Sequence, residues 1–290
     1  MIKKVLIIGY GSIGAKHKIN LLKIDKKLSF FLTNSKNKFD RQSLNKINPD
    51  YIIISTPTSM HYNNLKIVDS TLKKKVILVE KPIFHRLKEF KKNYKNKNKI
   101  FVGYNLRFHP IIQYLKNKTY KSNFFYLRSE CYSYLPNWRK RNYKKIYSSK
   151  KTMGGGVALD LSHEIDFINW IFGKIDIIFK KKFKVSKLKI SADDTFILVG
   201  KIKKMLVNVS LNFSSHHNKR KVVLDDQNET LECDLNKNYI KFFNKKNKLK
   251  KIVKFKKINS LLMMHKNILD KKYNSLCSIE DANKVLKLIN

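Results

Sequence analysis

The sequence predicts an α/β protein: a doubly wound parallel sheet comes first, and an α/β domain with an open, mainly antiparallel sheet follows. Up to about residue 120, short apolar runs alternate with helical segments at the spacing of strand–helix–strand units. Beyond that point strands mostly follow one another directly, and apolar and polar residues alternate along them. This change of pattern predicts two domains, 1–120 and 121–290.

In the first predicted domain the strands are unbroken apolar runs, which is typical of strands buried on both faces of a parallel sheet. Helices are expected at about 15–24, 62–72 and 87–97, the last of them rich in lysine. The expected strands cover residues 5–8, 28–32, 51–55, 76–79 and 100–102.

The second predicted domain has one strong helix at 157–172, which follows three glycines at 154–156. A terminal helix at 279–289 closes the chain. The expected strands cover residues 124–134, 175–184, 196–201, 205–213 and 222–225.

The charge of the chain is strongly positive, at +42 over 290 residues. Only seven of the 63 basic residues are arginine, and the lysines are spread from end to end. A nucleic-acid surface more often concentrates charge and uses arginine for bidentate phosphate contacts. We therefore interpret the charge as composition bias and expect no specific nucleic-acid partner, although the field favours anionic substrates and cofactors.

The composition also bears on the compartment. No apolar run reaches the roughly 18 residues of a membrane span, and the run at 5–8 is too short for a signal peptide. Three cysteines, Cys131, Cys233 and Cys277, are far apart and odd in number. They form neither a disulfide framework nor a metal-binding pair, which favours a reducing cytoplasm.

A glycine pattern, G-x-G-x-x-G, follows the first strand directly at Gly9, Gly11 and Gly14. Gly9 suits the tight turn, Gly11 lets the backbone approach a pyrophosphate, and Gly14 lets the following helix pack on the strand. Free N–H groups at the helix start would then meet the negative charge. The pattern predicts a dinucleotide site, to which the intervening residues Tyr10, Ser12 and Ile13 contribute.

The end of the second strand bears on the choice between NAD and NADP. An NAD enzyme usually places an acidic residue there to hold the ribose hydroxyls. This chain has Thr33, Asn34, Ser35 and Lys36 instead. Small polar residues and a lysine tolerate a 2′-phosphate, so we expect NAD(P) with a preference for NADP.

Polar residues also follow the third and fourth strands, where ligands bind in open α/β sheets. Lys81 stands between Glu80 and Pro82 at the end of the strand at 76–79. A proline there restricts the backbone and allows a cis peptide, either of which would aim the lysine into a cleft. Such a lysine can donate to a substrate oxygen or take its proton; the alternative is one more solvated lysine.

Asp160 and His163 are three residues apart on the predicted helix at 157–172 and would share one face. A carboxylate orients an imidazole and stabilises its protonated form, so the pair is a candidate acid–base unit. A capped helix start with a structural histidine is the alternative. Asp166 lies partly off that face, and the histidines and acids lack metal-ligand spacing, so no metal is expected.

Five motifs follow one another along the chain: G-Y-G-S-I-G-A-K-H, S-T-P-T-S-M-H, V-E-K-P, V-G-Y-N-L-R-F-H-P and G-G-G-V-A-L-D-L-S-H-E-I-D-F-I-N-W-I-F-G. In this order they resemble the Gfo/Idh/MocA family, named after glucose–fructose oxidoreductase and inositol dehydrogenase. The resemblance implies an N-terminal Rossmann domain and a C-terminal domain whose sheet forms a homodimer or homotetramer interface.

By position, the resemblance makes Lys81 the catalytic lysine, with Asp160 and His163 as substrate-binding and acid–base groups. Many family members space this acid and histidine by four residues rather than three, so the resemblance assigns His163 more directly than Asp160. Residues that would line the cofactor and the cleft are Ser55, Thr56, Pro57, His61, Glu80 and Asn105.

The expected activity is hydride transfer between a nicotinamide and a secondary alcohol or ketone of a sugar, polyol or sugar nucleotide. The stretch Y-S-Y-L-P-N-W, followed by G-G-G-V-A-L-D-L-S-H-E-I-D, resembles family members of surface-polysaccharide and sugar-nucleotide pathways, which implies a role in surface-polysaccharide biosynthesis. Two alternatives stay open: a bound cofactor that supports net non-redox chemistry such as glycoside cleavage, and a non-catalytic dinucleotide-binding regulator.

Overall fold

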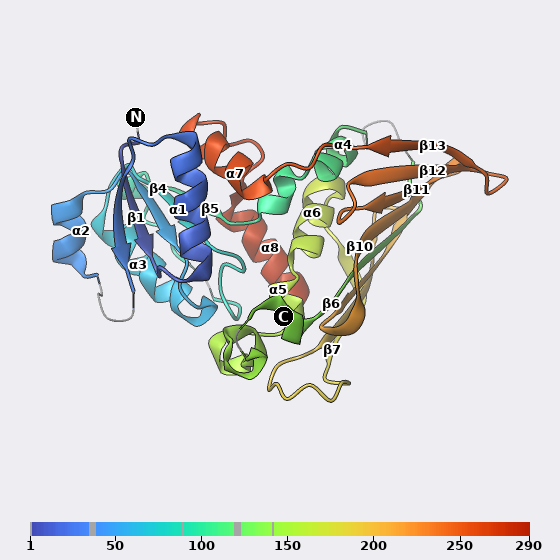
Figure 1. The fold of residues 1–290 in the computed structure, drawn as a ribbon, viewed down its shortest axis with the longest axis horizontal. Coiled ribbons are helices and arrows are strands. Elements are labelled where there is room, and N and C mark those ends of the chain that lie inside the picture. The colour runs from blue at the N-terminus through green and yellow to red at the C-terminus, as the bar shows by residue number, and fades with distance from the viewer. Residues whose placement is uncertain (1, 35–38, 89, 119–122, 141) are drawn as a thin grey trace. The chain divides into compact units, whose positions relative to one another are not determined.

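The structure is a computed structural model that describes residues 2–34, 39–88, 90–118, 123–140 and 142–290. The chain forms two compact units (Figure 1). The first comprises residues 1–108, 259–288 and 290, and the second comprises 109–258 and 289. Within the described ranges, every helix is too short or too polar to cross a membrane.

The first unit contains a six-stranded sheet with the order β14-β5-β4-β3-β1-β2. All neighbours pair in parallel except β14, which is antiparallel to β5. This confirms the doubly wound parallel sheet. Its strands are β1 (Lys4–Ile8), β2 (Ser29–Thr33), β3 (Tyr51–Ile54), β4 (Val76–Val79), β5 (Lys99–Val102) and β14 (Cys277–Ser278). Its helices are α1 (Ser12–Ile24), α2 (Arg41–Ile47), α3 (His61–Thr71), α7 (Ser260–Leu269) and α8 (Ile279–Ile289).

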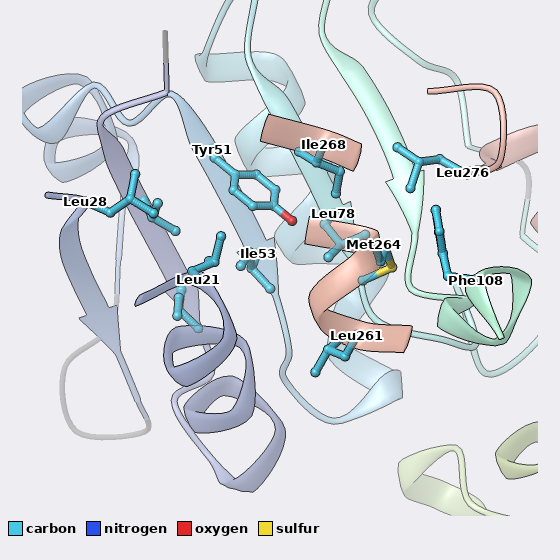
Figure 2. Packing of buried hydrophobic residues seen from close by; sticks show 12 residues of the cluster. Leu21, Leu28, Tyr51, Ile53, Leu78, Phe108, Leu261, Met264, Ile268 and Leu276 are labelled. Carbon is cyan, nitrogen blue, oxygen red and sulfur yellow. The ribbon is translucent and has the colours of Figure 1, made fainter. Parts of the chain in front are cut away.

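The core of the first unit lies where α1 and α7 cover one face of this sheet (Figure 2). Val5 and Ile7 of β1 alternate with Leu6 and Ile8, and all four side chains are buried. Burial on both faces explains the unbroken apolar run, because successive side chains of a strand point to opposite faces. Each such aliphatic side chain stabilises the fold by about 1.5–3 kcal/mol.

The segment 259–288 returns to the first unit, whereas the sequence predicts that it belongs to the second domain. Its helix α7 lies against α1, with Met264 and Ile268 in the core. Arg107, fully buried in this unit, holds Asp281 of α8 at 3.3 Å. Tertiary packing of this kind has no signature in local sequence.

The second unit contains an eight-stranded sheet with the order β13-β12-β11-β10-β6-β9-β8-β7. Among the described strands, only β6 and β9 pair in parallel, so the sheet is mainly antiparallel as predicted. Its strands are β6 (Tyr126–Tyr134), β7 (Asp176–Phe183), β8 (Thr195–Ile202), β9 (Met205–Asn212), β10 (Ser214–Asp225), β11 (Glu229–Asp234), β12 (Tyr239–Asn244) and β13 (Leu249–Lys254). Its helices are α4 (Pro110–Lys118), α5 (Val157–Asp160) and α6 (His163–Phe172).

The predicted lysine-rich helix at 87–97 is wrong. In the described part of that range, only a short 3-10 turn, Tyr94–Asn96, is helical. The buried carboxylate of Asp69 accepts the backbone N–H of Asn93 at 2.8 Å, and its carbonyl accepts the Asn96 amide. These contacts from Asp69, which is distant in the chain, hold the segment in a conformation that is not α-helical.

Candidate cofactor site and acid–base residues

The strands of the first unit end at one level of the sheet. Ile8 pairs with Ile54, Ile54 with Val79, and Val79 with Val102. The residues that follow these strand ends therefore form a row along the carboxyl edge: Gly9, Ser55, Glu80 and Gly103. The chain leaves β1 toward β2 on one side and resumes at β3 on the other, which makes this edge a topological switch point, where open α/β sheets bind ligands.

The glycine loop after β1 is closely packed at Gly9 and Gly14. Gly9 has a φ of +92°, and a Cβ there would lie 2.6 Å from the backbone nitrogen of Thr56. A Cβ at Gly14 would lie 2.7 Å from the carbonyl oxygen of Gly9. Both positions therefore exclude a side chain, and Gly14 lets α1 approach β1 as its place in the pattern predicts.

Gly11 differs from the other two glycines. A Cβ there would meet no atom of the described residues within 4 Å, so protein packing does not require a glycine. Gly11 is the N-cap of α1, and it carries no side chain that could cap the first N–H groups of the helix. The next residue, Ser12, is exposed, and the first turn holds no acidic residue. Open space in front of uncapped N–H groups fits a pyrophosphate.

Tyr10 and Ile13 complete the loop and are partly buried beside the core. The loop is anchored to β2 because the carbonyl of Thr33 accepts the N–H groups of Gly9 and Tyr10, at 3.1 and 2.8 Å. Thr33 is buried and Asn34 is exposed. Ser35 and Lys36 lie outside the described residues.

The loop after β3 is fixed by polar contacts. The Ser55 hydroxyl donates to the carbonyl of Gly9 at 3.0 Å, which joins this loop to the glycine loop. Asn64 donates to the Thr56 hydroxyl at 3.0 Å, while Pro57 is partly exposed. These contacts hold Ser55, Thr56 and Pro57 next to the glycine loop.

His61 is buried, and its two ring nitrogens face backbone carbonyls. Nε2 lies 2.9 Å from the oxygen of Thr56, and Nδ1 lies 3.0 Å from the oxygen of Pro82. Burial lowers the pKa of His61, although the carbonyls favour the charged ring. His61 thus joins the loop after β3 to the loop that carries Lys81.

Glu80 and Lys81 follow β4, and the peptide bond between Lys81 and Pro82 is cis. The Glu80 carboxylate lies 3.0 Å from Nε2 of the buried His17. Burial raises the pKa of Glu80, but the interaction with His17 and the nearby charge of Lys81 outweigh it and leave the pKa below its ordinary value. Glu80 is therefore a carboxylate at neutral pH and offsets part of the local positive charge.

Asn105 begins a 3-10 turn, Asn105–Phe108, that follows β5 and packs against α7. It is half-buried, and its N–H donates to the carbonyl of Gly103 at 2.9 Å. Asn105 therefore lies just beyond the row of strand ends.

Asp160 and His163 belong to the second unit, on two helices rather than the single predicted one. Asp160 ends α5 and His163 begins α6, with a break at Leu161 and Ser162. The Ser162 carbonyl accepts the N–H of Asp166, which starts a new helix. The prediction that the pair shares one continuous helical face is therefore wrong. Only two residues separate them, so both stay at the same junction.

Tyr147 donates its hydroxyl to the carboxylate of Asp160 at 2.8 Å. Burial and the negative charge of Asp160 raise the pKa of Tyr147 well above its ordinary value, so it remains a hydrogen-bond donor. Asp160 is buried and His163 is half-buried. The spacing of residues in the sequence does not predict this contact of Tyr147, because it depends on tertiary structure.

Two further contacts hold this junction. Asp193 accepts the N–H of Ala158 at 3.0 Å, which fixes the start of α5, and a Cβ at Gly156 would press on this carboxylate. The buried Glu164 pairs with Arg220 at 2.8 Å, and Arg220 also donates to Cys131. Burial raises the pKa of Cys131 to about 12, which makes it an unreactive thiol.

Comparison with known proteins finds no matching family model and no matching curated protein. Solved structures do match, over essentially the whole chain. An oxidoreductase from Thermotoga maritima has a TM-score of 0.82 and 16% identity, with 100% of this chain and 95% of that chain covered.

Two further matches carry more specific names. A UDP-N-acetylglucosamine 3-dehydrogenase from Acidithiobacillus ferrooxidans has a TM-score of 0.77 and 16% identity, covering 100% and 96%. The WlbA dehydrogenase from Bordetella pertussis, in complex with NADH and UDP-GlcNAcA, has a TM-score of 0.74 and 14% identity, covering 100% and 94%. At these identities the likeness defines the fold: the chain has the two-domain fold of these oxidoreductases, as the family resemblance implies.

The glycine loop provides a matched test of its packing. Replacing Gly9 by alanine should lower the free energy of unfolding by about 1–3 kcal/mol or more, because a positive φ and a backbone clash coincide there. Gly11→Ala should change it by less than about 1 kcal/mol, since its Cβ enters open space. Denaturant unfolding of both variants measures the difference, and equal effects would contradict the geometry.

Proposed function

We propose that this protein is an NAD(P)-dependent oxidoreductase that transfers a hydride between nicotinamide and a secondary alcohol or ketone of a sugar, polyol or sugar nucleotide. The single observation that carries the proposal is the open space at Gly11, in front of the uncapped start of α1 at the switch point of a parallel sheet. Packing does not explain that glycine, whereas a dinucleotide pyrophosphate does.

The residues proposed to hold the cofactor come from the loops at the carboxyl edge of the first unit. The nicotinamide, when bound, supplies the hydride chemistry. Thr33 ends β2 and Asn34 follows it, where an NAD enzyme usually has an acidic residue, which supports a preference for NADP. The full proposed set is Gly9, Tyr10, Gly11, Ser12, Ile13, Gly14, Thr33, Asn34, Ser35, Ser55, Thr56, Pro57, His61, Glu80 and Asn105.

The proposed catalytic residues are Lys81 of the first unit and His163 and Asp160 of the second. Lys81 polarises the substrate oxygen, and His163 takes or returns the hydroxyl proton. Asp160 binds substrate, with its carboxylate held by the protonated phenol of Tyr147. The resemblance to the Gfo/Idh/MocA family supports these roles, and the names of the similar solved structures support a sugar or sugar nucleotide as substrate.

A titration with NADPH and NADH, followed by nicotinamide fluorescence, tests the cofactor site directly. We expect binding of both, tighter for NADPH. Gly11→Asp should weaken binding by about 100-fold or more, since juxtaposed like charges cost several kcal/mol. The proposal fails if neither nucleotide binds at low salt, or if Gly11→Asp binds as well as the wild type.

The catalytic role of Lys81 is tested with a panel of sugars and sugar nucleotides. Lys81→Ala should lower kcat by about 10²- to 10⁴-fold, the usual contribution of a general acid or base, and leave the NADPH Kd nearly unchanged. Lys66→Ala, an exposed lysine of α3, is the control. If substrate is converted and no free reduced cofactor accumulates, the bound-cofactor alternative replaces simple dehydrogenation. If no compound is converted, a dinucleotide-binding regulator becomes the better hypothesis.

We also propose a cytoplasmic homodimer or homotetramer, assembled through the sheet of the second unit. Three free, buried cysteines support a reducing compartment. Along β8 the buried residues alternate with partly exposed ones such as Ile197, so one face of the sheet carries accessible apolar side chains. Sedimentation should show a mass of at least two chains. Ile197→Asp should reduce it to one chain, whereas Ile19→Asp on the exposed side of α1 should not.

A further inference from the structure

Behind Glu80, a chain of hydrogen-bonded side chains crosses the interior of the first unit. His17 of α1 faces Glu80 with Nε2 at 3.0 Å and faces Nε2 of His265 with Nδ1 at 2.8 Å. His265, on α7, faces the Tyr51 hydroxyl with its other nitrogen at 3.1 Å. Figure 2 shows this hydroxyl pointing toward α7. His17, His265 and Tyr51 are all completely buried.

The four groups come from four different elements and span the sheet. Tyr51 begins β3, and Glu80 follows the end of the neighbouring β4. Tyr51 pairs with Val76 at the start of β4, whereas Glu80 follows the end of β4. The hydrogen-bonded side chains therefore extend along the four residues of β4, roughly 13 Å. They thus connect the amino end of the sheet to the edge that carries the proposed cofactor site. A polar network of this length in a core is costly unless every member is satisfied.

The number of available protons restricts how the chain is hydrogen-bonded. An ionised Glu80 can only accept, so Nε2 of His17 donates to it. In a neutral His17, Nδ1 must then accept, which requires Nε2–H on His265 and leaves its Nδ1 to accept from Tyr51. All hydrogen bonds then point one way, from Tyr51 to Glu80. This arrangement satisfies each group and needs no buried charge beyond the carboxylate.

Two other observations agree with this arrangement. Burial lowers the pKa of His265 well below its ordinary value, so His265 is neutral. Gly103 leaves room for the carboxylate, since a Cβ there would lie 2.6 Å from Oε1 of Glu80. Among the described residues, the nearby charges of Lys81 and of His61 on α3 also favour the ionised form of Glu80.

We propose that His265 and His17 are positioning residues for Lys81. His265 fixes His17 as the Nε2–H tautomer, His17 holds Glu80 as an oriented carboxylate, and Glu80 fixes the charge environment of the adjacent lysine. The effect on catalysis rests on the function proposed above for Lys81. The tautomers of His17 and His265 do not depend on that function and can be measured without turnover.

The first measurement uses histidine ring nitrogens and glutamate carboxyls, labelled and followed by NMR across pH. In the wild type both His17 and His265 should be neutral Nε2–H tautomers at neutral pH. In His265→Leu, His17 loses this fixed tautomer, and the midpoint of Glu80 titration moves to higher pH because a hydrogen bond that lowers its pKa is weakened. With only seven glutamates in the chain, the carboxyl spectrum is simple enough to follow Glu80.

Conservative variants separate positioning from packing. His265→Gln keeps an N–H donor that can reach His17, and it should restore the His17 tautomer and the Glu80 midpoint. Tyr51→Phe removes only the outermost hydroxyl, and it should leave both largely unchanged. His217→Leu, an exposed histidine of the second unit, is the control. If His265→Leu does not fold, the wild type, His265→Gln and Tyr51→Phe still decide the tautomers.

The second measurement is kinetic, with a substrate found in the panel above. His265→Leu should lower kcat by up to roughly 10- to 100-fold, the factor expected if the hydrogen bond from His17 to the charged Glu80 is lost, with an unchanged NADPH Kd. His265→Gln should recover most of this loss. The positioning role is overturned if His265 carries its proton on Nδ1, if His17 is charged at neutral pH, or if His265→Leu and His265→Gln lower kcat to the same extent. Turnover by the wild type tests the proposed function separately. If the expected tautomers are found but no substrate is converted, the proposed function is rejected and the tautomer chain stands.

Discussion

Parallel pairing of β1, β3, β4 and β5 in one register is the constraint on which the first unit depends. Because Ile8, Ile54, Val79 and Val102 stand at one level, the residues after each strand gather at one edge. The contacts between loops follow from that row: Ser55 bonds to Gly9, and His61 joins Thr56 to Pro82. The proposed cofactor site is thus a consequence of strand register, and the side chains only refine it.

Residues from both ends of the polypeptide pack together in this unit. Helix α7 is made of residues 260–269, yet it covers the same face as α1 and contributes Met264 and Ile268 to the core. The same helix delivers His265 to His17. The apolar packing of α7 therefore buries the imidazole of His265, and a buried polar group is costly unless it is hydrogen-bonded. The hydrogen bonds of the Tyr51–His265–His17–Glu80 chain satisfy it and offset that cost.

The second unit shows how local contacts override helical periodicity. The stretch 157–172 has the residues of one helix, but it divides at Leu161 and Ser162 into α5 and α6. Asp193 fixes the start of α5 from a distant part of the chain, and Glu164 is drawn to Arg220 on β10. These contacts to α5 and α6 fix the junction at which Asp160 and His163 lie. The hydrophobic periodicity of the stretch does not predict such contacts, because they come from distant residues.

The sequence alone determined the fold class, most strand positions and the glycine loop, because apolar runs and glycine spacing act through local geometry. Tertiary structure alone decided the rest. The segment 259–288 joins the first unit, the lysine-rich stretch at 87–97 takes its contacts from Asp69, and Tyr147 meets Asp160. Each of these depends on groups distant in the chain that approach one another only after the sheets and helices have packed, so neither periodicity nor spacing could reveal them.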